Sequence, residues 1–221
     1  MSGWVDWSKT TQSNNYRGSN SFATFMIIGP TCFFLGILFA SFPYDFPLLW
    51  TSAPVPESFY AHLETHLKFM HQSPPLIGRL LNIIVFTGFL GFFIKLFRPS
   101  EANVLFDGAS LVLYLIGVGV YITNIVKGLR SVSAGIWDDA AAFADTAAKA
   151  AEGGSGEIIL GKEDSLKVLA ASNTILALVL VGVLVLQAGQ WYAERKDRED
   201  FDKLEKEESK KGGPAASKKK Q

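Results

Sequence analysis

The chain has 221 residues, 48% of them hydrophobic, and its 21 basic and 21 acidic residues give a formal net charge of zero. The apolar residues are gathered into long blocks rather than spread periodically as in a soluble core, which excludes an ordinary soluble globular protein. The single cysteine, Cys32, lies inside the first block. This excludes the four-span junctional or surface proteins whose outer loops are held by paired cysteines.

Four apolar blocks predict the fold class, an all-α integral membrane protein with four transmembrane helices in a bundle. Each block is close to the roughly 20 residues that a helix needs to cross about 30 Å of hydrocarbon. Strands are excluded because backbone polar groups in lipid must be satisfied within a helix or a closed barrel, and four segments cannot close a barrel. The predicted spans are residues 22–42, 76–97, 104–126 and 166–187.

A polar leader, residues 1–21, precedes the first block. A cleavable signal peptide has a shorter apolar core and small residues before the cut, so we expect the first block to remain as a helix. The spans then define a membrane domain, residues 22–192, which is followed by a charged tail, residues 193–221.

The stretch HLETHLKFMH, residues 62–71, raises the question of a metal site. His62 and His66 are four residues apart and would share one face of a helix. A metal site usually needs at least three protein ligands, the whole chain has three histidines, and the order of residues is not HExxH. We therefore expect a short amphipathic helix over residues 57–72 on the membrane surface, with no metal, no cofactor and no catalytic residue.

The basic residues predict that both termini are cytosolic, because cytosolic loops are enriched in lysine and arginine. The loop after the first span holds only Lys68. Lys127 and Arg130, just after the third span, argue the other way. The basic residues on the expected cytosolic side are Lys9, Arg17, Lys95, Arg98, Arg195, Lys196 and Arg198.

Uncharged polar residues are scattered through the spans. In lipid such side chains form hydrogen bonds worth about 0.6 to 2 kcal/mol, either within the bundle or, transiently, with another membrane protein. The one acid inside a span, Asp107, lies a turn into the third block, where we expect it to reach the interface. The lack of buried charges argues against a transporter or channel subunit. The candidate contacts to a partner are Asn82, Thr123, Asn124, Ser172, Asn173 and Gln187.

The tail from Ala193 to Lys211 is almost wholly charged with mixed sign, which predicts a solvated helix that extends the fourth span. The tail either keeps this end of the protein soluble or serves as a docking surface for cytosolic machinery. Lys218 and Lys219 stand fourth and third from the end, the positions that a dilysine retrieval signal of endoplasmic-reticulum membrane proteins requires. We assign no role to the alanine-rich loop, residues 138–151.

Several short motifs occur in order around the four blocks. They are FFLGILF (residues 33–39) with Tyr44-Asp45, Ser73-Pro74, YITNI (residues 121–125) with Gly128, Gly135 and Trp137, and ASNTIL through LQAGQWY (residues 171–192). In these motifs the chain resembles the fungal packaging chaperones of the endoplasmic reticulum that serve amino acid permeases, the Shr three family. The resemblance extends over residues 22–192.

The resemblance implies a non-enzymatic, multi-pass chaperone of the endoplasmic-reticulum membrane that assists newly inserted permeases and helps them enter coat-protein-II vesicles. The implied partners are amino acid permeases in the membrane and coat-protein-II components at the cytosolic tail, and no nucleic acid. The six polar residues, with close-packing glycines such as Gly88, Gly117 and Gly182, are then candidates to touch the client. A small transporter or channel subunit and, less readily, a lipid-modifying membrane enzyme that uses the histidines remain alternatives.

Overall fold

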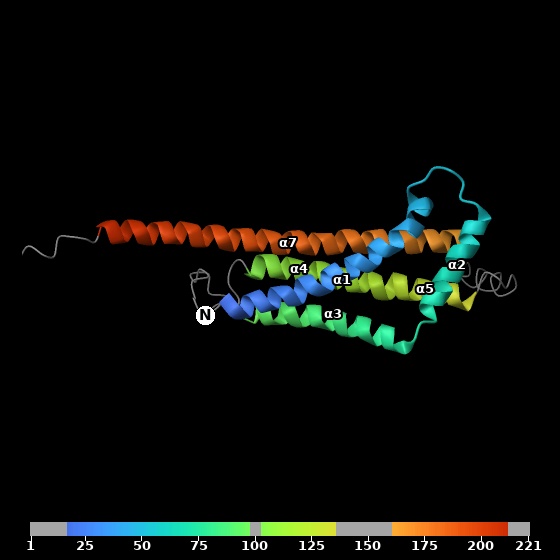
Figure 1. Ribbon diagram of the computed structural model, residues 1–221, viewed down its shortest axis with the longest axis horizontal. Helices are drawn as coiled ribbons and strands as arrows, with labels where there is room; N and C mark the ends of the chain where they lie inside the picture. Colours follow the sequence, from blue (N-terminus) through green and yellow to red (C-terminus); the bar gives the residue numbers. More distant parts are fainter. Residues whose placement is uncertain (1–16, 98–102, 136–160, 212–221) are drawn as a thin grey trace, which may run out of the picture.

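The computed structural model describes residues 17–97, 103–135 and 161–211, which are mostly helical (Figure 1). Within them, four helices are long and apolar enough to cross a membrane. This confirms the prediction of a helical protein with four candidate spans. The apolar helical segments are Phe22–Leu49, Pro75–Leu96, Leu105–Ala134 and Lys162–Leu204.

Helix α1 (Arg17–Leu49) is longer than the predicted first span at both ends and begins within the predicted leader. The predicted span ends at residue 42 with the apolar block, just before Pro43, and a proline lacks a backbone N–H and usually interrupts a helix. α1 nevertheless continues through Pro43 and Pro47. Packing accounts for this difference, because Leu48 is buried in a core cluster at the end of the bundle, and tertiary contacts override intrinsic helix preference.

The predicted amphipathic helix is present as α2 (Glu57–His71). It lies across one end of the bundle, beside α5 (Figure 1). Tyr60 and Leu63 of α2 are buried there. The apolar stripe of α2 therefore packs against the protein's own helices. The other buried members of this cluster are Leu48, Val132, Leu166 and Ala170.

The third candidate span is one continuous helix with two π-helical segments. Gly135 ends it with a φ of 61°, a left-handed conformation that a residue without a Cβ adopts readily. π-helical turns often occur at functional sites, and the second one coincides with the YITNI motif. The four parts are η2 (Asn103–Asp107), α4 (Gly108–Val120), η3 (Tyr121–Val126) and α5 (Lys127–Ala134).

The second and fourth spans differ in how far they extend. α3 (Pro75–Leu96) matches its prediction closely. α7 (Lys162–Lys211) is a single helix of 50 residues, so the predicted fourth span and the predicted helix of the tail are one element. Figure 1 shows its last part projecting beyond the bundle, at the end where α1 begins. In this projection Arg195 and Glu199 form an i,i+4 ion pair at 3.0 Å, which suits a solvated helix.

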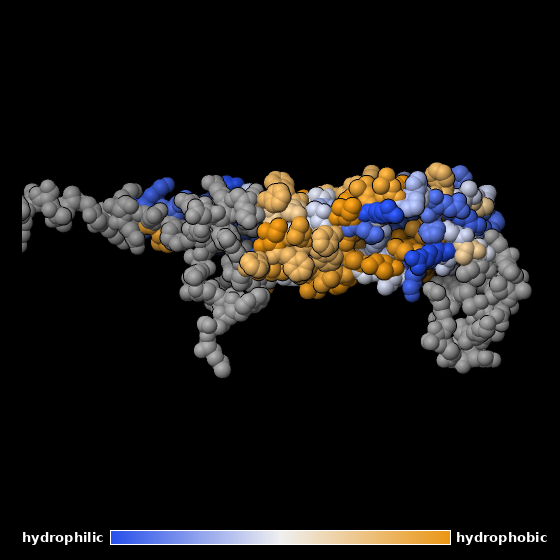
Figure 2. Space-filling model, turned by 90° about the horizontal axis from the view of Figure 1, so that it is seen from below, coloured by the Kyte–Doolittle hydropathy of each residue, from blue (hydrophilic) through white to orange (hydrophobic). Residues whose placement is uncertain are grey.

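α1 packs against both α3 and α7, and α7 also packs along α4. The approach of α1 to α3 is close because a glycine lies between them: a Cβ on Gly91 would be 2.9 Å from the carbonyl oxygen of Ala23. Small residues allow such approaches in membrane bundles. Figure 2 shows a band of hydrophobic residues on the outside of the bundle, with hydrophilic residues toward the α2 end. The buried core residues are Ile27, Phe34, Leu38, Phe92, Tyr114, Leu176, Leu180 and Val183.

Candidate functional site

A buried ion pair lies where α3 ends and α4 begins. Lys95 Nζ is 2.8 Å from Asp107 Oδ1, and the two side chains are 2% and 0% exposed. Lys95 is in the last turn of α3, and Asp107 is the last residue of η2. A charge buried inside a membrane bundle is costly unless it is paired and its remaining hydrogen-bonding capacity is also satisfied.

Two glutamines of α7 complete the bonding of this pair. Lys95 Nζ donates to the Oε1 atoms of Gln187 at 2.9 Å and Gln190 at 2.8 Å. In return, Nε2 of Gln187 donates to Asp107 Oδ1 at 2.9 Å, and Nε2 of Gln190 donates to Asp107 Oδ2 at 2.8 Å. Gln187 also donates to the Ser110 hydroxyl oxygen at 3.2 Å. We call these five residues the Lys95 network; all three Lys95 donors are used in it.

The Lys95 network corrects two predictions. Asp107 does not reach the interface but is fully buried against Lys95, and the premise that no charge is buried in the spans is wrong. The physical reason is that hydropathy averages over a block, whereas Lys95 ends one block and Asp107 begins the next. A signal for the site exists in the sequence, because Gln187 and Gln190 are three residues apart and share one face of the fourth span.

A second polar layer lies nearer the α2 end of α7. Asn173 Nδ2 donates to Asp45 Oδ2 at 3.0 Å, and Asn124 Nδ2 donates to Ser172 Oγ at 3.2 Å. The Ser172 hydroxyl donates in turn to the carbonyl of Val168 at 2.8 Å. We call Asp45, Asn124, Ser172 and Asn173 the Asn173 layer. It ties α7 to α1 on one side and to η3 on the other.

The two layers are roughly 22 Å apart along α7, since a helix rises about 1.5 Å per residue between Ser172 and Gln187. The motifs that carry the family resemblance supply the whole Asn173 layer and the two glutamines of the Lys95 network. The Asn173 layer draws on Tyr44-Asp45, YITNI and ASNTIL, and LQAGQWY supplies both glutamines of the Lys95 network. These motifs therefore mark the places where the spans are joined by hydrogen bonds.

The six predicted contact residues fall into two groups. Ser172 and Gln187 are buried, and Asn173 is half-buried against Asp45. These three side chains form hydrogen bonds within the bundle. The three that are exposed on the outside of the bundle are Asn82, Thr123 and Asn124.

The three glycines expected to pack closely face the protein's own helices. At each of them an added Cβ would meet a side chain of a neighbouring helix at 3.2 Å or less. They allow the spans of this bundle to approach one another. The facing pairs are Gly88 with Tyr114, Gly117 with Leu176, and Gly182 with Leu113.

Polar contacts hold α2 to the start of α7. Glu64, which is 7% exposed, pairs with Lys162 at 2.7 Å and with Lys68 one turn further along α2. Burial raises the pKa of Glu64, but the hydrogen bonds from Lys162 and Lys68 outweigh burial, and the pKa is lowered. Tyr60 donates to Glu163 Oε1 at 3.0 Å, and burial raises the pKa of Tyr60.

The histidines of α2 take part in packing or face outward. His66 stacks on Tyr44, with 4.5 Å between the ring centroids, and His62 is exposed. Among the residues that the structure describes, no three His, Cys, Asp or Glu side chains are close enough together to hold a metal ion. The stacked pair joins α2 to the last turns of α1.

Several predictions concern residues outside the described ranges. They stay predictions, since no contact or conformation is described for them. They are the retrieval signal Lys218 and Lys219, the alanine-rich loop 138–151, and the leader up to residue 16.

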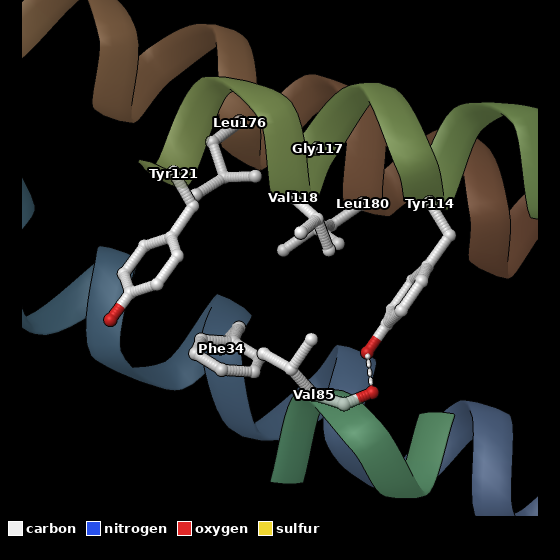
Figure 3. Close-up of a pocket in the computed structure, with 8 residues that line it drawn as sticks. All are labelled: Phe34, Val85, Tyr114, Gly117, Val118, Tyr121, Leu176 and Leu180. Atoms are coloured by element: carbon white, nitrogen blue, oxygen red, sulfur yellow. Dashed lines mark hydrogen bonds between the residues drawn. The ribbon is translucent and has the colours of Figure 1, made fainter. Parts of the chain in front are cut away.

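An apolar pocket lies between the two polar layers, where α3 and α4 face each other (Figure 3). The Tyr114 hydroxyl reaches from α4 to donate to the Val85 carbonyl of α3 at 3.1 Å, and this contact closes one end of the pocket. Tyr121 of η3 stands at the other end, and its ring lies beside that of Phe34 from α1. The other lining residues are Gly117, Val118, Leu176 and Leu180.

The sequence matches a known protein-family model. The family is described as SHR3 chaperone, ER membrane protein SH3, and the match covers residues 18–221. It thus extends beyond the motifs to the charged tail. No curated protein and no solved structure gives a match.

Proposed function

The chain belongs to the SHR3 chaperone family, and we propose that its buried and its exposed polar side chains have different tasks in serving a client. As a member of this family it is a non-enzymatic chaperone of the endoplasmic-reticulum membrane for amino acid permease packaging. In our proposal the Lys95 network and the bond of Asn173 to Asp45 hold the bundle in shape, and exposed polar side chains engage the permease. The observation that carries the proposal is the exposure of Asn82, Thr123 and Asn124 on apolar spans.

Incompletely assembled permeases present polar groups to lipid. Transporters form their binding sites from broken helices near the middle of the membrane, and a backbone group left unsatisfied in lipid costs several kcal/mol. A chaperone side chain that forms a hydrogen bond with such a group lowers this cost. Because each bond is worth about 1 kcal/mol, a few of them hold a client and still release it when its own helices assemble.

Thr123 and Asn124 are well placed for this task. Both are exposed and lie in η3, where the π-helical turn interrupts the regular backbone pattern. The Thr123 hydroxyl is 2.8 Å from the Gly119 carbonyl oxygen and 3.0 Å from Asn124 Oδ1. Since Asn124 also donates to Ser172, a client bound at η3 would be coupled to the layer that fixes α7.

The proposal includes cytosolic termini. An even number of spans puts the start of α1 and the end of α7 on one side, as they lie in Figure 1. Arg195 and Lys196 follow the apolar part of α7, and lysine and arginine concentrate on the cytosolic side of membrane proteins.

The projecting part of α7 is the proposed docking surface for coat-protein-II components. It is charged with mixed sign and exposed, and Asp200 and Lys203 form an ion pair at 2.9 Å along it. Because it continues the fourth span without a break, the docking surface has a fixed direction relative to the bundle. Lys218 and Lys219 would then serve to return the chaperone to the endoplasmic reticulum.

Rescue of cells that lack this protein tests the proposal, with radiolabelled amino acid uptake and permease imaging as the measurements. The double change Thr123→Val and Asn124→Leu should leave the chaperone at normal levels in the membrane and reduce permease delivery to the cell surface. Thr65→Val, at an exposed threonine of α2 outside the spans, is the matched control. Normal delivery with the double variant would remove η3 from the client site.

The tail is tested separately by ending the chain after Ala193. Permeases should then fold but remain in the endoplasmic reticulum, because membrane chaperoning is separated from vesicle packaging. Normal permease export with this truncated protein would contradict the docking role of α7.

A further inference from the structure

We propose that Arg79 and Asn82, on the outward face of α3, bind a carboxylate-bearing transmembrane helix of an unassembled permease. The proposal rests on the function proposed above and deepens it by naming the chemistry that the client supplies. Both side chains are exposed. Because they are three residues apart, they share one face of the helix.

The outward face of α3 is open to a partner. α3 lies at the edge of the bundle in Figure 1 and packs chiefly on α1. Its buried residues all lie in its second half, from Gly88 onward. Ile83 and Phe86, four and seven residues after Arg79, continue the outward face and are 62% and 67% exposed. A second helix can therefore pack along this face without a rearrangement of the bundle.

The two polar side chains are not satisfied by this chain. Within the described ranges, neither the Arg79 nor the Asn82 side chain forms a hydrogen bond or an ion pair. The other charged residue of α3, Lys95, is buried and paired with Asp107. An ionisable residue inside a span normally has such a partner or marks a functional site. Arg79 thus lacks the counter-ion that Lys95 has.

The depth of Arg79 places it just inside the hydrocarbon. α3 has 22 residues and is therefore about 33 Å long, close to the thickness of the hydrocarbon. Along the helix, Arg79 is about 6 Å and Asn82 about 10 Å from its start. In the proposed orientation this end faces away from the cytosol, where basic residues are disfavoured. Orientation in the membrane therefore does not account for an arginine at this position.

A carboxylate of a client helix fits this pair better than the other partners in a membrane. A lipid phosphate is within reach of an arginine that extends to the surface, but not of the shorter Asn82 a turn deeper. A second copy of this chain would bring Asp45 and Asp107, which are buried and already bonded. Transporters carry ionisable residues in their spans along ion and proton pathways, and in an unassembled permease these residues face lipid. The Arg79 guanidinium binds such a carboxylate, and the Asn82 amide bonds to a neighbouring polar group of the same helix.

The first measurement is the binding of a designed transmembrane peptide to the full-length protein in phosphatidylcholine nanodiscs, followed by fluorescence energy transfer. The probe is a helix rich in leucine and alanine with one aspartate about 6 Å inside one end. The control peptide has asparagine at that position. The aspartate peptide should bind about tenfold more tightly, as expected for a hydrogen-bonded charged pair. Equal binding of the two peptides would overturn the proposal.

Variants of Arg79 test which residue recognises the carboxylate. Arg79→Gln should abolish the preference for the aspartate peptide. Arg79→Lys should keep part of it, because lysine retains the charge but not the planar donor fork. Arg195→Gln, at an exposed arginine of α7 beyond the spans, is the matched control and should keep the whole preference. A preference that persisted in Arg79→Gln would refute the role of Arg79.

Asn82 is tested with the same two peptides. Asn82→Leu should weaken the binding of both peptides about threefold, which corresponds to one membrane hydrogen bond. The preference for aspartate should remain, because Arg79 is intact. Unchanged binding of both peptides would remove Asn82 from the site.

A photoreactive residue at Ile83 identifies the occupant of this face in the cell. During synthesis of a permease it should crosslink the permease, and Arg79→Gln should lower the yield about tenfold. A photoreactive residue at Phe39, which is 80% exposed on α1, should show no such dependence. Adducts of the Ile83 position with lipid alone would mean that Arg79 pairs with phosphate, and adducts with a second copy alone would mean self-association. Either result would overturn the proposal.

Permease delivery separates this inference from the proposed function. Arg79→Gln should reduce delivery to the cell surface, with the chaperone at normal levels in the membrane. If this variant delivered permeases normally while Thr123→Val with Asn124→Leu did not, the carboxylate site would be refuted and the chaperone function at η3 would stand. Normal delivery in cells that lack the protein would instead refute the proposed function.

Discussion

The two polar layers of the bundle differ in how completely they are closed. In the Lys95 network the charged pair and both glutamines are buried and bond to one another. In the Asn173 layer, Asn124 is exposed, Asn173 is half-buried, and the bonds form separate pairs. The ion pair accounts for the closed network, because a buried lysine and carboxylate require complete partners. The Asn173 layer contains no cation, and its buried acid, Asp45, accepts a bond from Asn173.

The difference indicates which part of the bundle is held fixed by its own hydrogen bonds and which part has polar side chains that can bond to another protein. The closed network joins α3, η2, α4 and α7 near the point where α7 leaves the bundle, so it also sets the direction of the projecting helix. The open layer lies toward the α2 end, and its exposed member belongs to η3. A change in the closed network should therefore affect the stability of the whole bundle more than a change in the open layer.

Breaking the closed network should have the largest effect. Lys95→Met leaves Asp107 buried without its cation, and removal of one partner from a buried ion pair typically lowers the free energy of unfolding by about 3 to 5 kcal/mol. The measurement is denaturant unfolding of the purified protein in detergent. Lys95→Met with Asp107→Leu is the control, because replacement of a buried pair by apolar residues is often nearly neutral. Wild-type stability in the single variant would show that the pair is not buried in the membrane.

The contact of α1 with α3 beside this network should be the next most sensitive. Gly91 lies one turn before Lys95, and its Cβ would meet the Ala23 backbone at 2.9 Å, so Gly91→Ala forces the helices apart. Overpacking of this kind costs about 1 to 3 kcal/mol. Gly78→Ala on the same helix is the control, since no atom lies within 4 Å of its Cβ position. Equal unfolding free energies for the two variants would mean that α1 and α3 are not in close contact.

The open layer should respond more weakly. Asn173→Leu removes the hydrogen bond to Asp45, and we expect a loss of about 1 kcal/mol, within the range of side-chain hydrogen bonds in membrane bundles. Thr174→Val is the control, because the Thr174 hydroxyl bonds to the Ala170 carbonyl within α7 and joins no other helix. A loss as large as that of Lys95→Met would abolish the distinction between an open and a closed layer.

The sequence predicts the elements of this fold better than their contacts. Block length predicts four spans, and mixed charge predicts the helix from Ala193 to Lys211. The end of α1 is missed because Pro43 and Pro47 are held in the helix by packing that lies far away in the sequence. The Lys95 network is missed because hydropathy does not say which helix faces meet. The family motifs contain the Asn173 layer and both glutamines of the Lys95 network, although they do not say which residues bond to which.

The attachment of α2 should have the smallest effect and the clearest dependence on pH. The pKa of Glu64 is lowered from its ordinary value of 4.5, so its pairing with Lys162 and Lys68 stabilises the fold above that value and is lost as the pH falls through the lowered pKa. Glu64→Gln should weaken α2 by about 0.5 kcal/mol at neutral pH, a value typical of ion pairs near the surface, because both lysine partners are partly exposed. Hydrogen exchange of α2 amides measures this, and the variant should lose the acid-dependent part of their protection. Glu57→Gln, in the exposed first turn of α2, should keep it. If Glu64→Gln kept the full pH dependence, another group would control the docking of α2, and the stacked pair of His66 and Tyr44 would be the next contact to change.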